Sequence, residues 1–479
     1  MKNQLLLKIL CLLVTLALLM FGLSLIQDVV RDRIRNQGYA VQSVVDSLAG
    51  PQTLMGPILV QICTETTSTK NGTKLEYSTR EFQRLLLPDE LKHAAKASMD
   101  ERSRGLHHVN TYALGSEIKA IFHQPSQYQK VPEASVPGAV VRCGKMRVAI
   151  ALSDPRGIRS AKIFAAGKQL DVESGTPLER YSRGFQAEIP ADALSTEKSL
   201  EVLASVDVVG TQSLAFVPLG VENRMSLSAD WPHPSFGGSF LPERREVSDS
   251  GFDASWTLSS LATSARQAFV QQTPVCINTS ASSAVDDVVE HTAVTAMAGS
   301  RVGPCLETMV TQFIDPVNPY VLSDRATKYG VLFIVLTFVA VGLFEVLKRL
   351  RVHPIQYFLV GSALCSFFLL LLSFSEHFGF ATAYAIAASA CVLLLAYYAS
   401  HILGSVRRGL PFAAGITSLF GLLFLLLQLE QTALIVGAIA LFAVLALVMV
   451  CTRNVDWYGF NKLSETASER ESAVMGEGS

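Results

Sequence analysis

The chain of 479 residues contains little charge, few cysteines and few glycines or prolines. Only 17% of its residues are charged, and the 40 basic residues nearly balance the 41 acidic ones, giving a net charge of −1. The low charge excludes an intrinsically disordered chain, and its balance excludes a bulk basic field that binds nucleic acid. The 32 Gly, 19 Pro and 8 Cys exclude collagen-like and disulfide-scaffold proteins. Because 49% of the residues are hydrophobic, the remaining class is a membrane protein.

The hydrophobic residues gather in six runs, each long enough to cross a bilayer as a helix. The first covers 5–26, is interrupted only by Lys8 and lacks a small-x-small cleavage site, which favours an uncleaved transmembrane anchor at 1–26 over a signal peptide. The other five runs form a transmembrane domain at 329–453 and are expected at 329–347, 355–374, 378–403, 411–429 and 432–451. A large polar domain at 27–328 separates the first span from the second.

Positive charges predict the orientation of these spans, because short loops rich in Lys and Arg stay in the cytoplasm. The alternate turns, at 375–377 and 430–431, carry neither residue. The pattern predicts that both termini are cytoplasmic, that 27–328 lies outside the cytoplasm, and that 454–479 is a polar cytoplasmic tail. The residues that set this topology lie between the second and third spans and between the fourth and fifth: Lys348, Arg349, Arg351, Arg407 and Arg408.

Within the domain at 27–328, Gly50 and Pro51 end any helix that continues from the first span, and the sequence after them is typical of β-strands. Short runs with β-type composition alternate with turn signals, and a short helix is expected after Pro88. The pattern predicts an α+β domain built as a sandwich or as two packed sheets. Strands are expected at 53–62, 74–79, 109–113, 146–152, 161–166, 185–189, 200–208, 213–217 and 224–227.

Four cysteines lie in this domain and allow three pairings. A bond between Cys276 and Cys305 is one candidate, because it closes an Ala/Ser/Thr-rich insertion at its neck, at a gain of roughly 3 to 4 kcal/mol in the chain-entropy model. A bond between Cys63 and Cys143 is a second candidate, and four buried thiols are the alternative.

Motifs of common enzymes are absent from the sequence, including H-E-x-x-H, G-x-S-x-G, G-x-x-x-x-G-K-[ST] and C-x-x-C. Ser195 and Lys198 have the S-x-x-K spacing of penicillin-recognising enzymes, but no K-T-G follows them. The histidines outside the spans lack the spacing of metal ligands. We therefore expect a non-enzymatic protein with no catalytic residues, no metal and no cofactor.

One extramembrane segment is a candidate partner-binding loop, because it places aromatic rings on a stiff, proline-containing backbone. The candidate loop consists of Trp231, Pro232, His233, Pro234 and Phe236. The alternative is a turn between strands with Trp231 in the core.

Inside the spans, Glu345 lies close to Lys348, so a salt bridge at the helix end explains this acidic residue without a transport role.

A set of short strings is spread along nearly the whole chain: Gly50–Val60 (GPQTLMGPILV), WPHPSFGG from Trp231, FLP from Phe240, GF and AxW at 251–256, RATKYG from Arg325, HPIQY from His353, SEH from Ser375 and DWY from Asp456. These strings resemble motifs of the bacterial CreD family of inner-membrane proteins. The chain departs from that family at 61–63 and in the insertion at 277–304.

The resemblance implies a bacterial inner membrane, a periplasmic location for 27–328 and a role in cell-envelope integrity or envelope stress response. The oxidising periplasm makes disulfides plausible. The partners expected are the lipid bilayer and an envelope protein, glycan or lipid, and no nucleic acid. The alternative function is a transporter or lipid-handling protein that acts through the five C-terminal spans.

Overall fold

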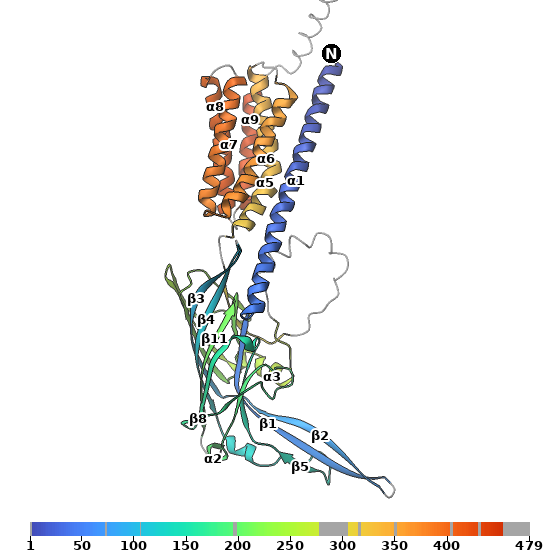
Figure 1. Ribbon diagram of the computed structural model, residues 1–479, viewed down its shortest axis with the longest axis vertical. Helices are drawn as coiled ribbons and strands as arrows, with labels where there is room; N and C mark the ends of the chain where they lie inside the picture. The colour runs from blue at the N-terminus through green and yellow to red at the C-terminus, as the bar shows by residue number, and fades with distance from the viewer. Residues whose placement is uncertain are drawn as a thin grey trace, which may run out of the picture. The chain divides into compact units, whose positions relative to one another are not determined.

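The computed structural model describes the chain except for residues 1, 72–73, 106, 195–198, 277–304, 315–317, 349–351, 403–405, 430–432 and 454–479 (Figure 1). It divides into two compact units. The helical unit comprises Met1–Asn36 and Val317–Ser479, and the β unit comprises Gln37–Pro316. A large β-rich domain thus lies between the first and second membrane helices, which confirms the predicted fold class.

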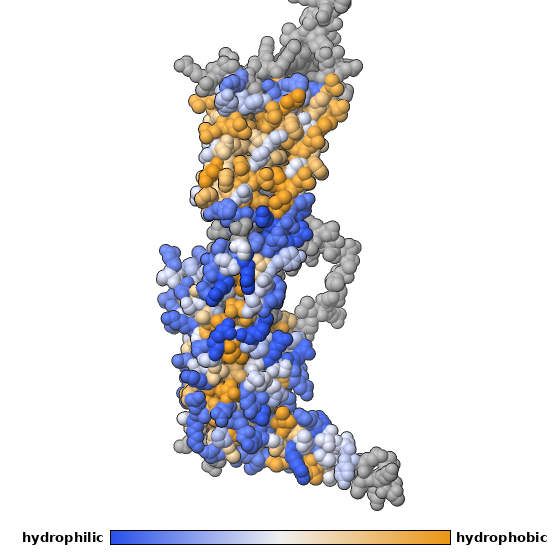
Figure 2. All heavy atoms as spheres, in the orientation of Figure 1, coloured by the Kyte–Doolittle hydropathy of each residue, from blue (hydrophilic) through white to orange (hydrophobic). Residues whose placement is uncertain are grey.

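The helical unit consists of long apolar helices whose surface is mostly hydrophobic (Figure 2). By length and composition, α1 and α5 to α8 can each cross a membrane. Helix α9 is also apolar and lies where the sixth span is predicted. The helices are α1 (Lys2–Ser47), α5 (Pro319–Lys348), α6 (Pro354–Ser375), α7 (Phe380–Ile402), α8 (Val406–Gln428) and α9 (Ala433–Thr452).

Local sequence explains where these helices begin. Helix α6 starts with Pro354 in its first turn, after a reciprocal capping interaction between His353 and Gln356. Helix α5 begins at Pro319 rather than at residue 329, because the Asn318 side chain accepts a hydrogen bond from the Tyr320 N–H at 3.0 Å. Its first turns are therefore polar although they are helical.

The β unit is built from two sheets. Sheet A has the order β14-β17-β12-β1-β6-β10-β9, with β2 and β5 also paired to β1, and sheet B has the order β15-β16-β13-β3-β4-β11-β7-β8. Every one of the nine predicted runs is a strand. The bounds are β1 (Gln52–Asn71), β2 (Lys74–Leu86), β3 (Glu90–Arg104), β4 (His107–Phe122), β5 (Val140–Cys143), β6 (Arg147–Leu152), β7 (Ile158–Ala165), β8 (Lys168–Leu170), β9 (Val172–Ser174), β10 (Gly184–Glu188), β11 (Leu200–Thr211), β12 (Ser213–Phe216), β13 (Glu222–Ala229), β14 (Pro234–Gly238), β15 (Arg244–Ser248), β16 (Gly251–Ser259) and β17 (Met309–Phe313).

The short helices of the β unit lie elsewhere than expected. Residues after Pro88 form strand β3, not a helix, so that prediction is wrong. Leu91, His93 and Ala95 are buried and the residues between them are exposed. This alternation packs one side of β3 into the core, which overrides the helical propensity of its alanines. The short helices are α2 (Ala191–Leu194) and α3 (Ala265–Val270), with 3₁₀ turns at Pro125–Gln129, Pro155–Gly157 and Ser260–Ala262.

One core fills the space between the inner faces of both sheets. On β11, alternate residues point into it, so Val202, Ala204 and Val206 are buried while the residues between them face solvent. Tyr112 is also buried, and its hydroxyl donates a 2.7 Å hydrogen bond to the Ser213 carbonyl. Sheet B therefore has one apolar face and one face in water, the pattern of an antiparallel sheet that covers a core on one side.

The two chain connections of the β unit leave it at one corner of sheet A. Gln52, at the start of β1, pairs with Leu214 of β12, and Leu214 pairs with Thr311 of β17. Helix α1 enters at β1, and β17 leads on to α5. Only one strand separates the two connections.

The last turn of α1 is fastened to the β unit by polar contacts. Asp154 accepts hydrogen bonds from the Gly50 N–H at 3.0 Å and from the Arg156 guanidinium. Arg156 also donates to the Asp46 carbonyl at 2.7 Å. Burial opposes the charged form of Asp154, but the bonds from Arg156 and Gly50 outweigh it and hold the pKa of this carboxyl below its ordinary value.

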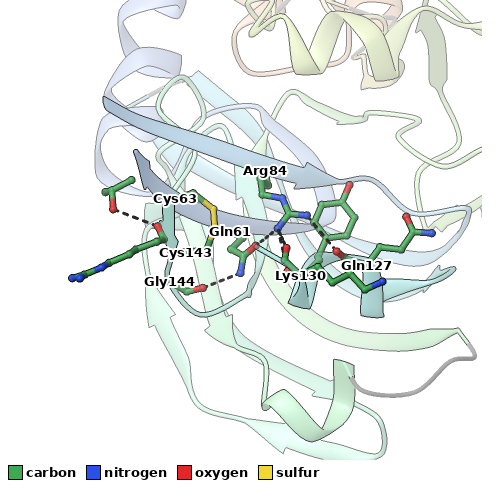
Figure 3. The surroundings of a disulfide bond; sticks show 10 residues. Gln61, Cys63, Arg84, Gln127, Lys130, Cys143 and Gly144 are labelled. Carbon is green, nitrogen blue, oxygen red and sulfur yellow. Dashed lines mark hydrogen bonds between the residues drawn. A yellow bond between two sulfur atoms is a disulfide. The ribbon is translucent and has the colours of Figure 1, made fainter. Parts of the chain in front are cut away.

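A long hairpin of β1 and β2 is fixed at its base, as Figure 3 shows. Cys63 of β1 and Cys143 of β5 are directly opposed and joined by a disulfide. Arg84 of β2 donates to the Gln61 side chain at 3.0 Å and lies over the Tyr128 ring at 4.6 Å. These contacts fix the direction in which the hairpin leaves the sheet.

Candidate functional site

A groove crosses the solvent face of sheet B, perpendicular to its strands. Its floor is a row of cross-strand neighbours with mostly small side chains, which leaves a hollow. Two adjoining cavities of about 700 and 690 Å³ share this floor. We call it the floor row: Ser255, Ser226, Ala94, Glu117 and Ser205.

One wall of the groove is a row of three cations on neighbouring strands. Arg224 of β13 pairs with Lys92 of β3, and Lys92 pairs with Lys119 of β4. Each side chain is at least 39% exposed. These three residues, here called the cation row, line the 690 Å³ cavity.

An apolar pair continues the same wall. Leu203 of β11 pairs with Lys119 on one side and with Phe164 of β7 on the other. Leu203 is 41% exposed, although it lies on the solvent face. Both residues line the same cavity as the cation row, so positive charge and apolar surface adjoin within one hollow.

Like charges that face each other across strands destabilise a sheet. Here three carboxylates reduce that repulsion, one for each cation. Glu222 and Glu90 lie two residues before Arg224 and Lys92 on the same strands, and Glu201 pairs with Lys119 from the neighbouring strand. The distances are 3.9 Å from Arg224 to Glu222, 3.8 Å from Lys92 to Glu90, and 2.6 Å from Lys119 to Glu201. Exposed pairs of this kind contribute about 0 to 1 kcal/mol, so a better anion can replace them.

The 700 Å³ cavity on the other side of the floor row is more polar. Lys96, Asp207 and Asp253 line it from β3, β11 and β16, and Arg244 with Glu246 contribute from β15. Both signs of charge alternate along this wall. This half of the groove is suited to hydrogen-bonding groups rather than to a single charge.

Beneath the cation row, a polar pair lies in the core. The His93 ring hydrogen-bonds to the Ser116 hydroxyl and packs edge-on to Phe216 at 4.2 Å. His93 is 5% exposed and Ser116 is 3% exposed. Burial lowers the pKa of His93 to about 3, so the ring is neutral near pH 7. The His93 ring thus packs in the core, while the residue itself is also part of the lining of the 690 Å³ cavity.

The segment expected as a partner-binding loop contains an edge strand of sheet A. Strand β14, which begins at Pro234, pairs with β17. The Phe236 ring packs edge-to-face on Phe252 and Trp256, and the Trp231 indole N–H donates to backbone carbonyls, including that of Ile314 at 3.2 Å. The aromatic side chains therefore pack against the core. Pro232 is half-buried and His233 is exposed at the turn before the strand.

The structure joins Cys276 and Cys305 by a disulfide, and it also joins Cys63 and Cys143. The insertion between Cys276 and Cys305 lies outside the described residues, at 277–304. Ser195 and Lys198 lie outside them as well. Among the residues that the structure does describe, no three or more His, Cys, Asp and Glu side chains gather as a metal site.

Three of the residues predicted to set the topology fall at helix ends. Lys348 ends α5, Arg407 and Arg408 lie in the first turn of α8, and Arg349 and Arg351 are outside the described residues.

Glu345 pairs with Lys8 of α1 and accepts a hydrogen bond from the Tyr357 hydroxyl at 2.8 Å. The single charged residue in the first apolar run is thereby neutralised by α5. The side chain of Lys348, the partner expected from the sequence, lies outside the described residues.

Sequence reasoning missed the groove. The alternation of polar and apolar residues on β13 and β11 signals a sheet with one wet face. It does not reveal which residues of four distant segments become neighbours, because this depends on strand order and register.

Within the described residues, a two-sheet domain is inserted in the sequence between the first long apolar helix and the others, which defines an integral membrane protein with a large extramembrane domain. The family described as Inner membrane protein CreD matches residues 4–458. Inner membrane protein CreD of Escherichia coli (strain K12) is 32% identical over 473 residues, 98% of this chain and 97% of that protein. The chain belongs to the CreD family of inner-membrane proteins, which confirms the resemblance of its motifs.

Proposed function

We propose that this protein contributes to cell-envelope integrity by binding an envelope component in the groove of sheet B, without catalysing a reaction. The β unit lies on the periplasmic side and both termini are cytoplasmic. The observation that carries the proposal is the groove itself, because its floor row exposes a continuous hollow across five strands. Its charged and apolar walls provide selectivity.

The attachment of the β unit supports the same function. Both connections leave one corner of sheet A, and the groove crosses the solvent face of the other sheet. The groove thus faces away from the strands that carry the connections.

The interior of the helical unit favours this proposal over transport through the spans. Phe367 is fully buried and packs on Phe368, Tyr384 and Phe420 with ring centroids 4.7 to 5.4 Å apart. Phe333 packs on Phe420 at 4.7 Å. Aromatic rings fill the space where a solute would need polar groups.

The proposal is tested by filling the groove. Ala94→Trp places an indole on the floor row, and Ala134→Trp adds the same ring at an exposed position outside it. Each variant is expressed in cells that lack the native protein, and survival is measured under detergent and antibiotic stress of the envelope. We expect the Ala94 variant to behave like the deletion and the Ala134 variant like the wild type. Equal survival of both variants would refute the groove as the functional site.

Photo-crosslinking in living cells tests what the groove contacts. Photoreactive side chains at Ser226 and Ser205 sample the floor row, and one at Lys145, which is 73% exposed elsewhere in the β unit, is the control. We expect adducts from the first two positions that the third does not give. The same adducts from all three positions would indicate non-specific capture.

The orientation is tested with a thiol reagent that does not cross the inner membrane. A cysteine at Lys168, exposed on β8, should react in cells whose outer membrane is permeabilised. A cysteine at Arg453, after α9, should react only after lysis. The reverse pattern contradicts the proposed topology.

A further inference from the structure

The cation row is costly to build in the absence of a ligand. Arg224, Lys92 and Lys119 face one another across adjacent strands, where like charges repel. Two of the three carboxylate partners lie at 3.8 and 3.9 Å, at the limit of an ion pair. An anion placed above the row would remove the repulsion and gain three charge-assisted contacts.

The size of the row limits the anion. Three neighbouring strands span two strand spacings, or about 10 Å. The hydroxyls of Ser226, Ser255 and Thr257 line the same cavity and provide hydrogen-bond donors. This geometry fits one compact anionic group, such as a phosphate diester, better than a chain of separated charges.

The apolar pair determines what is attached to that anion. Leu203 directly adjoins Lys119, and Phe164 follows Leu203 on the next strand. A free inorganic anion would leave these side chains in water. A hydrocarbon chain attached to the anionic group would cover them, with a gain of about 25 cal/mol per Å² of apolar surface.

We propose that the groove binds an anionic lipid, with its charged headgroup on the cation row and its hydrocarbon chain along Leu203 and Phe164. This inference rests on the proposed function and names the class of envelope component. An extended acidic peptide is less well matched, because its charges would be spread along the groove and past the apolar pair. The lipid needs charge at one end only.

The test uses the full-length protein in nanodiscs of phosphatidylcholine. The probe is dihexanoylphosphatidylglycerol, a short-chain anionic lipid used below its micelle concentration, and binding is followed by native mass spectrometry. One variant removes the cation row (Arg224→Gln, Lys92→Gln, Lys119→Gln), and another removes the apolar pair (Leu203→Ser, Phe164→Ser). The matched control replaces three exposed cations that also have carboxylate partners: Lys145→Gln, Arg147→Gln and Lys168→Gln.

We expect the control to bind like the wild type, the variant without the cation row to bind at least tenfold more weakly, and the variant without the apolar pair at least fivefold more weakly. Glycerol phosphate and dihexanoylphosphatidylcholine should each bind at least tenfold more weakly than the probe. Unfolding followed by the fluorescence of the buried Trp256 shows whether each variant keeps the fold.

Several results would overturn the proposal. If the cation-row variant and the control bind the lipid equally well, the cation row does not bind the headgroup. Equal binding of glycerol phosphate and the lipid leaves an anion site only, and equal competition by a hexaglutamate peptide indicates an acidic-peptide groove.

Failure of this inference can be told apart from failure of the proposed function. If the lipid does not bind but cells with Ala94→Trp lose envelope resistance, the ligand class is wrong and the functional groove stands. If the lipid binds and those cells are resistant, the binding stands and the proposed function fails.

Discussion

The helical unit and the β unit each hold one part of helix α1, and they do so by different means. In the helical unit, Leu19 and Leu23 lie against glycines: a Cβ at Gly361 would lie 2.1 Å from Leu19 Cδ1, and one at Gly330 would lie 3.0 Å from Leu23 Cδ2. In the β unit, the helix end is fastened by hydrogen bonds and by the Asp154–Arg156 ion pair.

The difference follows from the two solvents. Lipid tails are as apolar as leucine, so a membrane helix gains little from apolar burial and depends on close packing at small residues. In water, apolar burial already stabilises the sheets, and charged groups can fix the position of a helix end at a helix carbonyl. Helix α1 is therefore part of the helical core as well as an anchor.

The comparison can be tested with one probe for each unit. Cys365 and Cys391 are buried thiols of the helical unit, and they become reactive to a thiol-specific dye when it unfolds. Cys11 and Cys451 are replaced by serine in the background chain. Trp231 and Trp457 are replaced by phenylalanine in the same background, so that the fluorescence of Trp256, which is buried in the β unit, reports the unfolding of that unit.

The largest effect is expected from Gly361→Leu. The new side chain overlaps Leu19, and the helical unit should lose about 3 kcal/mol or more. The midpoint of unfolding that the thiol dye reports should fall, while the midpoint that Trp256 fluorescence reports should not change. Gly421→Leu in α8 is the control, because nothing lies within 4 Å of its Cβ position. If both variants unfold alike, the close contact with α1 does not stabilise the unit.

The opposite pattern is expected from Asp154→Ala. The change leaves the Gly50 N–H and the Arg156 guanidinium without their acceptor, at a cost of about 2 to 3 kcal/mol. The Trp256 transition should fall and the thiol-dye transition should not. Asp253→Ala on the solvent face of β16 is the control, expected to change stability by less than about 0.5 kcal/mol. A shift of the thiol-dye transition would show that the two units do not respond separately.

Acid should weaken the β unit through His93. Its pKa is about 3 in the folded state against about 6.5 in an unfolded chain, so the unfolded state alone gains a proton as pH falls from 6.5. The free energy of unfolding of the β unit should fall by up to about 1.4 kcal/mol per pH unit below pH 6.5, or by about 2 kcal/mol at pH 5. His93→Gln keeps a partner for Ser116 and should flatten the dependence of the Trp256 transition. An unchanged slope in this variant would assign the acid sensitivity to other groups.

The smallest effect is expected from Lys8→Gln. It removes the ion pair with Glu345 while the Tyr357 hydroxyl still donates to that carboxylate, so the helical unit should lose about 1 kcal/mol. The thiol-dye transition measures the loss. Adding Glu345→Gln should restore part of it, because no unpaired charge is then left at the site. A double variant that is less stable than the single one would argue against this pairing.

The sequence predicts the two units unequally well. Apolar runs locate every membrane helix, since a bilayer imposes one length and one composition on a helix, but α1 extends to Ser47, well beyond its apolar run. The start of α5 was missed, because its first turns are polar and only a cap at Asn318 marks them. In the β unit the nine predicted runs fall on strands, whereas alanine-rich β3 reads as a helix and the other strands, β5, β8, β9 and β14 to β17, were not named from the sequence.

The groove and the pairing of Glu345 could not be predicted for the same reason. Lys8 is 337 residues from Glu345 in sequence, and only the packing of α1 on α5 brings the two side chains together. In the groove, Arg224 and Lys92 become neighbours through a parallel pairing of β13 with β3. Local composition does not predict contacts that depend on strand order.

The corner at which both connections leave sheet A has a consequence for how the β unit can be handled. Gln52 and Thr311 are each paired to Leu214, so a β unit cut at these two residues would have ends about 10 Å apart. Ends that close characterise a domain that can be inserted into, or cut out of, a host chain without disturbing either fold. The β unit is thus an insertion between α1 and α5. Joining its two cut ends by a short linker should yield a water-soluble protein that retains the groove.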